Sequence, residues 1–446
     1  MDAQYSVGTL PAVFSLPNEL LVAIAVVSQE SESESVLYDS FVCRPERTLS
    51  HVCRHFRKVL IGTSILWTLV GANLTLEGSV ETMKLYLTRS GTCRIRVSLY
   101  ETSPMVDEDS CVMEGLAQLL LNAHRISRMA VRVGSEGSIS TLLGVFSDAA
   151  APALQRLEIR VTGPELPQFP LRIFSSDPPQ ALTALILNGF IPKLPLPPWT
   201  ASLTHLETEL FEETADSCVL ELVARCPLLV HVSLDLSRSP VLQRFGRIAL
   251  PSVKSLHVGL NIDAGAPYLL ELIGFLDAPV LTDLVVRGSH GNQISPLFDS
   301  SSAVNSSFPA LTSLSFINRA ECGGESGDAS FVPYTRSITS LPPRHFPALS
   351  SLTLVNQCFT YDVVREIVGP TSPPWSLLET LTVCPPRRPS WESTFPDVIL
   401  SMRRRGHILP KLRFSRSLFS RPDWDELGVR VEEFDPVDAI AAVHRY

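Results

Sequence analysis

Two histidines and a cysteine near the amino terminus form a possible metal site. His51 and His55 are four residues apart with Cys53 between them, so on a helix both imidazoles could share a metal ion. A zinc protease would need a glutamate directly after the first histidine, and Val52 occupies that position. No further ligands cluster nearby, so we expect these side chains to face solvent or a partner, without a metal.

Motifs for other kinds of catalysis are absent from the sequence. The chain contains no Walker loop, no Gly-x-Gly-x-x-Gly and no Gly-x-Ser-x-Gly nucleophile elbow. Serine, histidine and aspartate are plentiful, but no motif places them as nucleophile, base and orienting group. We therefore expect a protein that is not an enzyme and needs no cofactor.

Two charged segments could bind or be modified. Residues 30–35 alternate glutamate and serine and could be phosphorylated by acid-directed kinases, although a solvated loop is the favoured interpretation. Residues 387–421 hold nine arginines or lysines, which could bind an acidic or phosphorylated ligand through bidentate guanidinium contacts. An acidic stretch from Asp423 to Asp438 follows directly, and neutralisation by it is the simpler interpretation.

Composition limits the class of protein. Of 446 residues, 45% are hydrophobic and 19% charged, which is typical of a folded chain with more than one compact core or a repeat array. The net charge of -9 argues against a nucleic-acid binder. The nine cysteines are odd in number and form no Cys-x-x-Cys, which favours reduced thiols in the cytoplasm or nucleus. The most apolar run, Leu20 to Val27, is far shorter than the roughly 20 residues that span a bilayer, so we expect no membrane partner.

The elements nearest the amino terminus are predicted to be three short helical segments. Residues 1–13 are expected to be flexible, residues 14–75 to form a small helical domain, and residues 28–46 to be a loop inserted into it. Pro17 suits the first turn of the first helix, and Thr48 can cap the second. The apolar positions at helical spacing are Leu20, Leu21, Ile24 and Val27, then Leu49, Val52, Cys53, Phe56, Val59 and Leu60, and finally the cluster Ile65, Leu66, Trp67 and Leu69.

This succession resembles an F-box. The similarity is carried by Leu-Pro-Asn-Glu-Leu-Leu at 16–21, Leu-Ser-His-Val-Cys-Arg-His-Phe-Arg at 49–57, and Leu-Trp at 66–67. The resemblance implies that the domain binds the Skp adaptor protein and, through it, a cullin. The residues it assigns to adaptor binding are Leu16, Pro17, Glu19, Leu20, Leu21, Ile24, Leu49, Val52, Cys53, Phe56, Leu66 and Trp67.

A physical argument also favours docking. Some fifty residues in three short helices cannot bury all of these apolar side chains internally, and exposed apolar patches mark partner surfaces. The alternative is that the same side chains pack on the following repeats, with the helices serving as an amino-terminal cap. The Leu66-Trp67 cluster would then be the seam between the two parts.

The rest of the chain is organised by a recurring unit. After a predicted helix at 79–90, a strand at 94–100 and a helix at 113–123, the frame Pro-x-Leu-x-x-Leu-x-Leu recurs at intervals of 21 to 38 residues. It resembles leucine-rich repeats in irregular form. We expect an α/β fold: a solenoid over residues 76–420 with parallel strands on its concave face and helices on its convex face, then an acidic cap or tail at 421–446.

Period-two alternation in these strands predicts which side chains line the concave face, because the repeat leucines point into the core. The early part of this face is charged and the later part is rich in serine and threonine. For any single residue, exposure to solvent without a partner is the simplest expectation. The candidate target-binding residues are Arg156, Glu158, Arg160, His205, Glu207, Glu209, His231, Asp235, His257, Asp283 and Arg287.

The combination resembles F-box proteins with leucine-rich repeats, as in the expanded F-box-like families of mushroom-forming fungi. It implies a non-catalytic, substrate-recruiting subunit of a ubiquitin ligase that holds a target protein near a conjugating enzyme on another subunit. The alternative is a repeat scaffold that binds a protein but joins no ligase. The identity of the target cannot be read from the repeat pattern.

Overall fold

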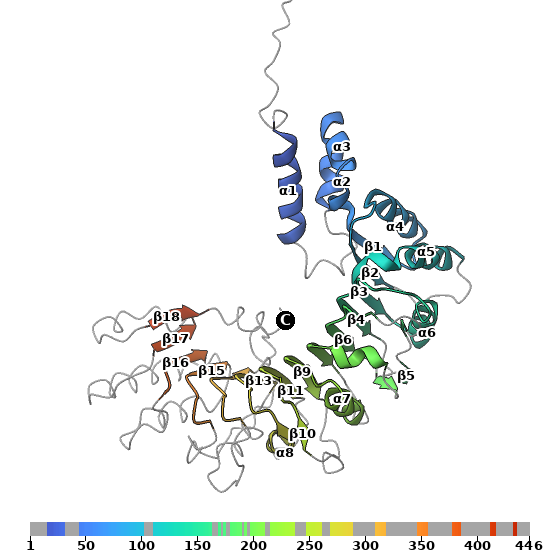
Figure 1. Ribbon diagram of the computed structural model, residues 1–446. Coiled ribbons are helices and arrows are strands. Elements are labelled where there is room, and N and C mark those ends of the chain that lie inside the picture. Colours follow the sequence, from blue (N-terminus) through green and yellow to red (C-terminus); the bar gives the residue numbers. More distant parts are fainter. Residues whose placement is uncertain are drawn as a thin grey trace, which may run out of the picture. The chain divides into compact units, whose positions relative to one another are not determined.

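The computed structural model shows a mixed α/β protein with a large parallel sheet (Figure 1). The chain divides into two compact units, one of residues 1–186 and 197–199 and one of residues 187–196 and 200–446. Within the described residues there are eight α-helices, none of them long and apolar enough to cross a membrane. The structure describes residues 16–31, 44–101, 110–162, 168–170, 173–174, 179–189, 191–193, 197–209, 215–236, 247–260, 268–288, 308–317, 346–355, 377–384, 411–415 and 431–434.

The first unit begins with helices α1 (Asn18–Ser31), α2 (Pro45–Ser50), α3 (Arg54–Ile61) and the short 3₁₀ helix η3 (Ser64–Trp67). The prediction of one continuous second helix capped by Thr48 is wrong. The first segment ends at Ser50, with His51 as its C-cap. Cys53 adopts an extended backbone, and its Sγ accepts a hydrogen bond from the Phe56 amide at 3.4 Å, so it caps the next helix. The predicted insert at 28–46 is also too wide, because α1 continues to Ser31 and α2 begins at Pro45. Residues 1–13 lie outside the described part.

These helices pack onto the helix that follows them, α4 (Glu77–Arg89). Trp67 is buried, its indole lies edge-on to Tyr86 of α4 at 5.0 Å, and its Nε1 donates to the Leu60 carbonyl at 2.9 Å. The carboxylate of Glu46, also buried, accepts hydrogen bonds from the Tyr86 hydroxyl and from Gln29 of α1. A buried polar network therefore joins α1, α2 and α4.

The strands of the first unit follow one another in chain order. The order is β1 (Leu69–Asn73), β2 (Ile95–Tyr100), β3 (Ile126–Val133) and β4 (Arg156–Val161), with all three pairs parallel. The next strand, β6 (Ala184–Asn188), contains residues of both units. The connections carry α4, α5 (Ser110–Leu121), η4 (Ala123–Arg125) and α6 (Glu136–Val145). The short elements β5 (Gln168–Pro170), β7 (Ile191–Lys193) and η5 (Pro198–Ser202) lie near the boundary between the units.

The second unit continues the same arrangement, with one strand for each copy of the repeat. Its strands are β8 (His205–Glu209), β9 (His231–Leu236), β11 (Ser255–Leu260), β13 (Asp283–Arg287), β14 (Ser313–Ile317), β15 (Ser351–Val355), β16 (Thr380–Cys384), β17 (Lys411–Ser415) and β18 (Val431–Phe434), in that order. Helices α7 (Ala215–Ala224) and α8 (Tyr268–Phe275) and the paired β10 (Ile248–Ala249) and β12 (Leu276–Asp277) lie between them. The segment predicted as an acidic tail contains β18, which pairs in parallel with β17.

The repeat frame has a structural explanation in a turn that precedes β4, β6, β8, β9, β11, β13, β14 and β15. The amide of the first repeat residue donates to a carbonyl three residues earlier, as in Val253 to Leu250 and Leu311 to Phe308. Proline takes the second position in six of these eight turns, as at Pro251 and Pro309, because its fixed φ suits that position and its missing N–H is not needed there. The turns before β6 and β8 have Gln180 and Ala201 at that position.

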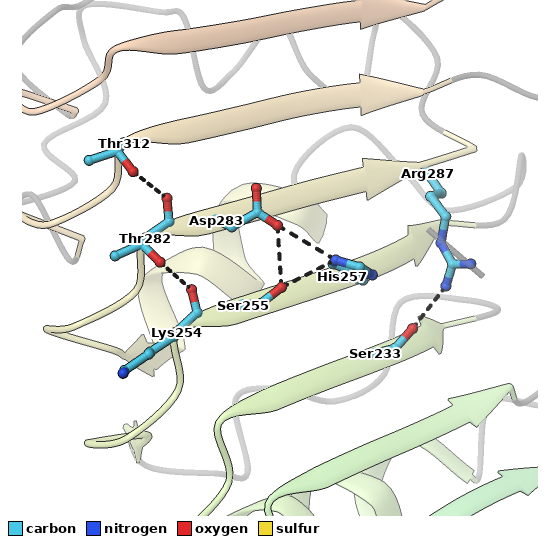
Figure 2. A network of polar contacts seen from close by, with 8 residues as sticks. All are labelled: Ser233, Lys254, Ser255, His257, Thr282, Asp283, Arg287 and Thr312. Atoms are coloured by element: carbon cyan, nitrogen blue, oxygen red, sulfur yellow. Dashed lines mark hydrogen bonds and ion pairs between the residues drawn. The ribbon is translucent and has the colours of Figure 1, made fainter. Parts of the chain in front are cut away.

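Strand register keeps equivalent repeat positions side by side. Leu206 is followed across the sheet by Val232, Leu256 and Leu284, and all four are buried. Side chains at strand entries add to the register: Thr282 Oγ1 donates to the Lys254 carbonyl at 3.0 Å, as Figure 2 shows. Because side chains alternate between faces, this register also aligns the residues of the opposite face, called here the outward face.

Candidate functional site

In the second unit the outward face of β8, β9, β11 and β13 gathers most of the predicted target-binding residues. Three rows run across these strands. The first holds His205, His231, Ser255 and Asp283, the second Glu207, Ser233, His257 and Val285, and the third Glu209, Asp235, Gly259 and Arg287. Ser233 and Ser255 were missed in the sequence, although the same alternation places them between predicted positions.

A network of Ser255, His257 and Asp283 lies at the centre of this face (Figure 2). Ser255 Oγ is 3.2 Å from His257 Nε2 and donates to Asp283 Oδ2 at 3.2 Å. Asp283 Oδ2 also lies 3.6 Å from His257 Nε2. The imidazole is only 7% exposed, so the simple expectation that it is solvated is wrong. His257 lies along the sheet because a neighbouring strand supplies its polar partner.

These three residue types are those of a serine hydrolase, but their geometry is different. A catalytic triad needs the serine and the aspartate on opposite nitrogens of the histidine, so that one nitrogen takes a proton while the other is held. Here Ser255 and Asp283 both approach Nε2, and the serine proton is directed at the aspartate. This network therefore organises a polar surface and does not activate Ser255 as a nucleophile.

A second contact spans three strands in the third row. Arg287 of β13 donates through Nη2 to Asp235 Oδ1 of β9 at 2.7 Å and to Ser233 Oγ at 3.1 Å. Between them lies Gly259 of β11, where an added Cβ would be only 1.7 Å from Asp235 Oδ1. Because Gly259 has no Cβ, the Asp235 carboxylate can occupy this space. Arg287 is 7% exposed, so it too is buried and not solvated as expected.

Burial and neighbouring groups shift the pKa of two residues on this face, His231 and Asp283. The imidazoles of His205 and His231 are stacked, with ring centroids 4.6 Å apart. Burial lowers the pKa of His231, and the charge of His257 lowers it further. Burial opposes ionisation of Asp283, but hydrogen bonds from His257, Ser313 and Ser255 outweigh it and lower the pKa of that carboxyl. The face therefore favours a neutral His231 beside an ionised Asp283.

The remaining predicted face residues lie on β4 in the first unit. Glu158 Oε1 accepts from Arg160 Nε at 2.6 Å, and its Oε2 lies 3.9 Å from Arg156 Nη2. Glu158 is 6% exposed, which corrects the expectation of a solvated side chain. Burial raises the pKa of Glu158, while Arg160 acts in the opposite direction. The Glu158 carboxylate is thus buried in the sheet and interacts with the guanidinium groups of Arg156 and Arg160.

The residues assigned to adaptor binding divide into two groups. Four of them, Leu21, Phe56, Leu66 and Trp67, are at most 2% exposed, so their role as contact residues does not fit this structure. They form the core that holds the helices together. Exposed members of the set are Pro17, Glu19, Leu20, Ile24 and Val52, and the half-buried members are Leu16, Leu49 and Cys53.

The other candidates give no chemical site within the described residues. His51 and His55 are exposed, while Cys53 caps α3, and no group of three or more metal-ligating side chains occurs in that part of the chain. Nearly all of the acidic serine run and of the basic segment 387–421 lies outside it. In comparisons with known proteins, no family model matches the chain and no curated protein matches it. The candidate site is therefore described by its own geometry, as a polar face of aligned charged and hydroxyl side chains.

Proposed function

We propose that this protein is the substrate-recruiting subunit of a Skp–cullin–F-box ubiquitin ligase, working in the cytoplasm or nucleus. The observation that carries the proposal is that α1 is apolar on two faces. Leu21 and Ala25 are buried in the helical core, whereas Leu20, Ile24 and Val27 are 52%, 47% and 63% exposed at helical spacing. This second stripe, called here the α1 ridge, lies outside the core of the helical domain.

An apolar ridge on a short helix is suited to a partner surface. Burying one such side chain against a protein contributes about 1.5–3 kcal/mol before ordering costs. Val52, which is 48% exposed just after α2, adds to the apolar surface of the same helical domain. The F-box-like order of motifs identifies the Skp adaptor as the partner for which the ridge is suited.

The repeats supply the second binding surface of this protein. We interpret the sheet as a leucine-rich-repeat-like solenoid whose outward face binds a target protein through its mixed charged and hydroxyl side chains. A chain that binds the target through its repeats and the ligase through its helical domain raises the effective concentration of the target at the conjugating enzyme. This mechanism needs no catalytic residue in the chain.

Co-purification of the full chain with the Skp adaptor tests the proposal. Leu20→Asp combined with Ile24→Asp should weaken binding at least tenfold, because a partner would have to bury two charges. Leu121→Asp is the matched control, since Leu121 is 71% exposed at the end of α5 and lies outside the helical domain. The proposal fails if the wild type shows no adaptor binding at micromolar concentration or if the ridge variant binds like the control.

A second function, a repeat scaffold that joins no ligase, is favoured by a different observation. Trp67 packs on Tyr86 of α4, so the helices also cover the end of the sheet at β1, as a cap would. In that case the ridge substitutions should change neither adaptor binding nor target binding. The adaptor experiment therefore distinguishes the two functions.

A further inference from the structure

The turns before the strands of the second unit form an uncharged row at one edge of the sheet. The row, called here the turn row, crosses six strands that are neighbours in the order β9, β11, β13, β14, β15 and β16. Parallel register aligns one residue of each turn, three positions before the first residue of its strand: Leu228, Ser252, Val280, Ala310, Ala348 and Leu377. An exposed proline precedes each of the first five.

The turn row combines large exposed side chains with small ones. Leu228, Val280 and Leu377 are 53%, 39% and 55% exposed. Ser252, Ala310 and Ala348 are half-buried. Exposed apolar side chains that lie in register along one edge form a continuous patch, and such patches are typical of surfaces that another protein covers.

A second row lies two residues further along each strand and contains the only charges of the two rows. It consists of Val230, Lys254, Thr282, Thr312, Ser350 and Glu379. Lys254 and Glu379 are both exposed, and Figure 2 shows the Lys254 side chain pointing away from the strands. They lie four strands apart, which corresponds to about 19 Å.

The two rows are complementary to a second copy of themselves. A two-fold axis that lies in the interface at Ala310, perpendicular to the rows, reverses the order of the strands. It would place Lys254 of each copy opposite Glu379 of the other. The same axis sets Val280 opposite Ala348 and Leu377 opposite Ser252, so that each large side chain meets a small one; Leu228, at the end of the row, lies outside this set of pairs. A two-fold interface needs this relation, because one patch serves both copies.

We propose that two copies of this protein associate through the turn row and its neighbouring charged row. A second copy is favoured over a different protein because one surface supplies both sides of every contact. The uncharged turn row also lets two chains that each carry -9 approach one another there. The row spans about 24 Å, which is small for an interface, so we expect a reversible dimer of modest affinity. The inference does not depend on the proposed function, since neither α1 nor the outward face takes part.

Sedimentation equilibrium of the full chain, from about 1 to about 100 µM, tests the proposal. We expect the average mass to rise with concentration towards twice that of one chain. Val280→Asp with Leu377→Asp should weaken self-association about tenfold or more, because the dimer would then bury four unpaired charges. Leu121→Asp is the matched control and should change nothing, since Leu121 is 71% exposed on α5 of the first unit.

Charge exchange tests the two-fold arrangement itself. Lys254→Glu alone and Glu379→Lys alone should each weaken self-association about tenfold, because each dimer then contains two like-charge pairs. A mixture of these two variants should form a heterodimer, since both of its pairs again have opposite charge. A chain that carries both substitutions should associate as the wild type does.

Three results would overturn the proposal. A wild type that stays monomeric at about 100 µM would leave the turn row to a different protein. The other two are a Val280/Leu377 variant that associates like the Leu121 control, and a mixture of the charge variants that associates no better than either one alone. A folding defect cannot imitate recovery in the mixture, so the charge exchange remains decisive if the aspartate variant fails to fold. None of these measurements uses the Skp adaptor, so their failure is distinguishable from failure of adaptor binding.

Discussion

Gly259 offers a sharp test of how the outward face of the second unit is held together. In the structure an added Cβ would lie 1.7 Å from Asp235 Oδ1 and 2.5 Å from its Cγ, so Gly259→Ala must displace the carboxylate. The displaced Asp235 would lose its 2.7 Å contact with Arg287, which is itself buried. The substitution should therefore act through an ion pair in which Gly259 takes no part.

The size of the effect follows from that contact. A hydrogen bond to a charged group contributes about 1.5–3 kcal/mol, and the side chain of Asp235 is 24% exposed, so the loss should be near the middle of this range, about 2 kcal/mol. With Asp235→Ala already present, the carboxylate is gone and only a 3.2 Å approach to the Asp235 Cα remains. There Gly259→Ala should cost less than about 1 kcal/mol. The two substitutions should thus be coupled.

Native-state hydrogen exchange of the amides in β9, β11 and β13 would measure these local opening free energies. Gly274→Ala is the control, because a Cβ at Gly274 of α8 meets nothing within 4 Å and should cause no loss in these strands. An equal penalty for Gly259→Ala in the wild-type and Asp235→Ala backgrounds would refute the reasoning. It would mean that the glycine serves the backbone and not the ion pair.

Three further predictions concern stability. The pKa of His231 is lower in the folded state, so its neutral imidazole stabilises the protein above about pH 6.5, and this contribution is lost as pH falls through the folded pKa. The His231→Gln variant should therefore show a smaller decline of the urea midpoint between pH 7 and 5 than the wild type. An unchanged decline would contradict this. Cys53→Ala should lower the thermal midpoint by an amount corresponding to about 0.5–2 kcal/mol, whereas Cys53→Ser, which keeps an acceptor for the Phe56 amide, should not. Trp67→Ala should cost about 3–5 kcal/mol in urea denaturation because the indole is buried against Tyr86, and a cost below 1 kcal/mol would show that it is not part of the core.

The strands were predictable because their signal is local. Each copy of the frame contains its own alternating apolar residues, most copies contain a proline turn, and β9, β11, β13 and β14 lie where the frame places them. Helix boundaries were less predictable. The stripe from Leu49 to Leu60 fits one helix as well as two, and the choice depended on whether Cys53 would continue the helix or cap the next one.

The candidate site was predictable as a set of positions but not as a set of contacts. Alternation identified the outward residues, including Glu158, His257 and Arg287, yet favoured solvent exposure for each one. His257 and Arg287 are buried beside partners on other strands, Asp283 and Asp235, whereas Glu158 is paired with arginines of its own strand. The same alternation in β3, where Met129 and Val131 are buried, would also have placed Arg128 and Arg132 on the outward face.

The α/β class, the spacing of the strands and the face on which each strand residue lies follow from the local sequence. These properties depend on residues a few positions apart, through turn geometry and period-two alternation. Contacts between side chains depend on the folded arrangement, because Asp235 and Arg287 are 52 residues apart and come together through parallel register. The same register aligns Arg96, Arg128 and Arg156 across β2, β3 and β4. It arises from hydrogen bonds between segments that no local pattern connects.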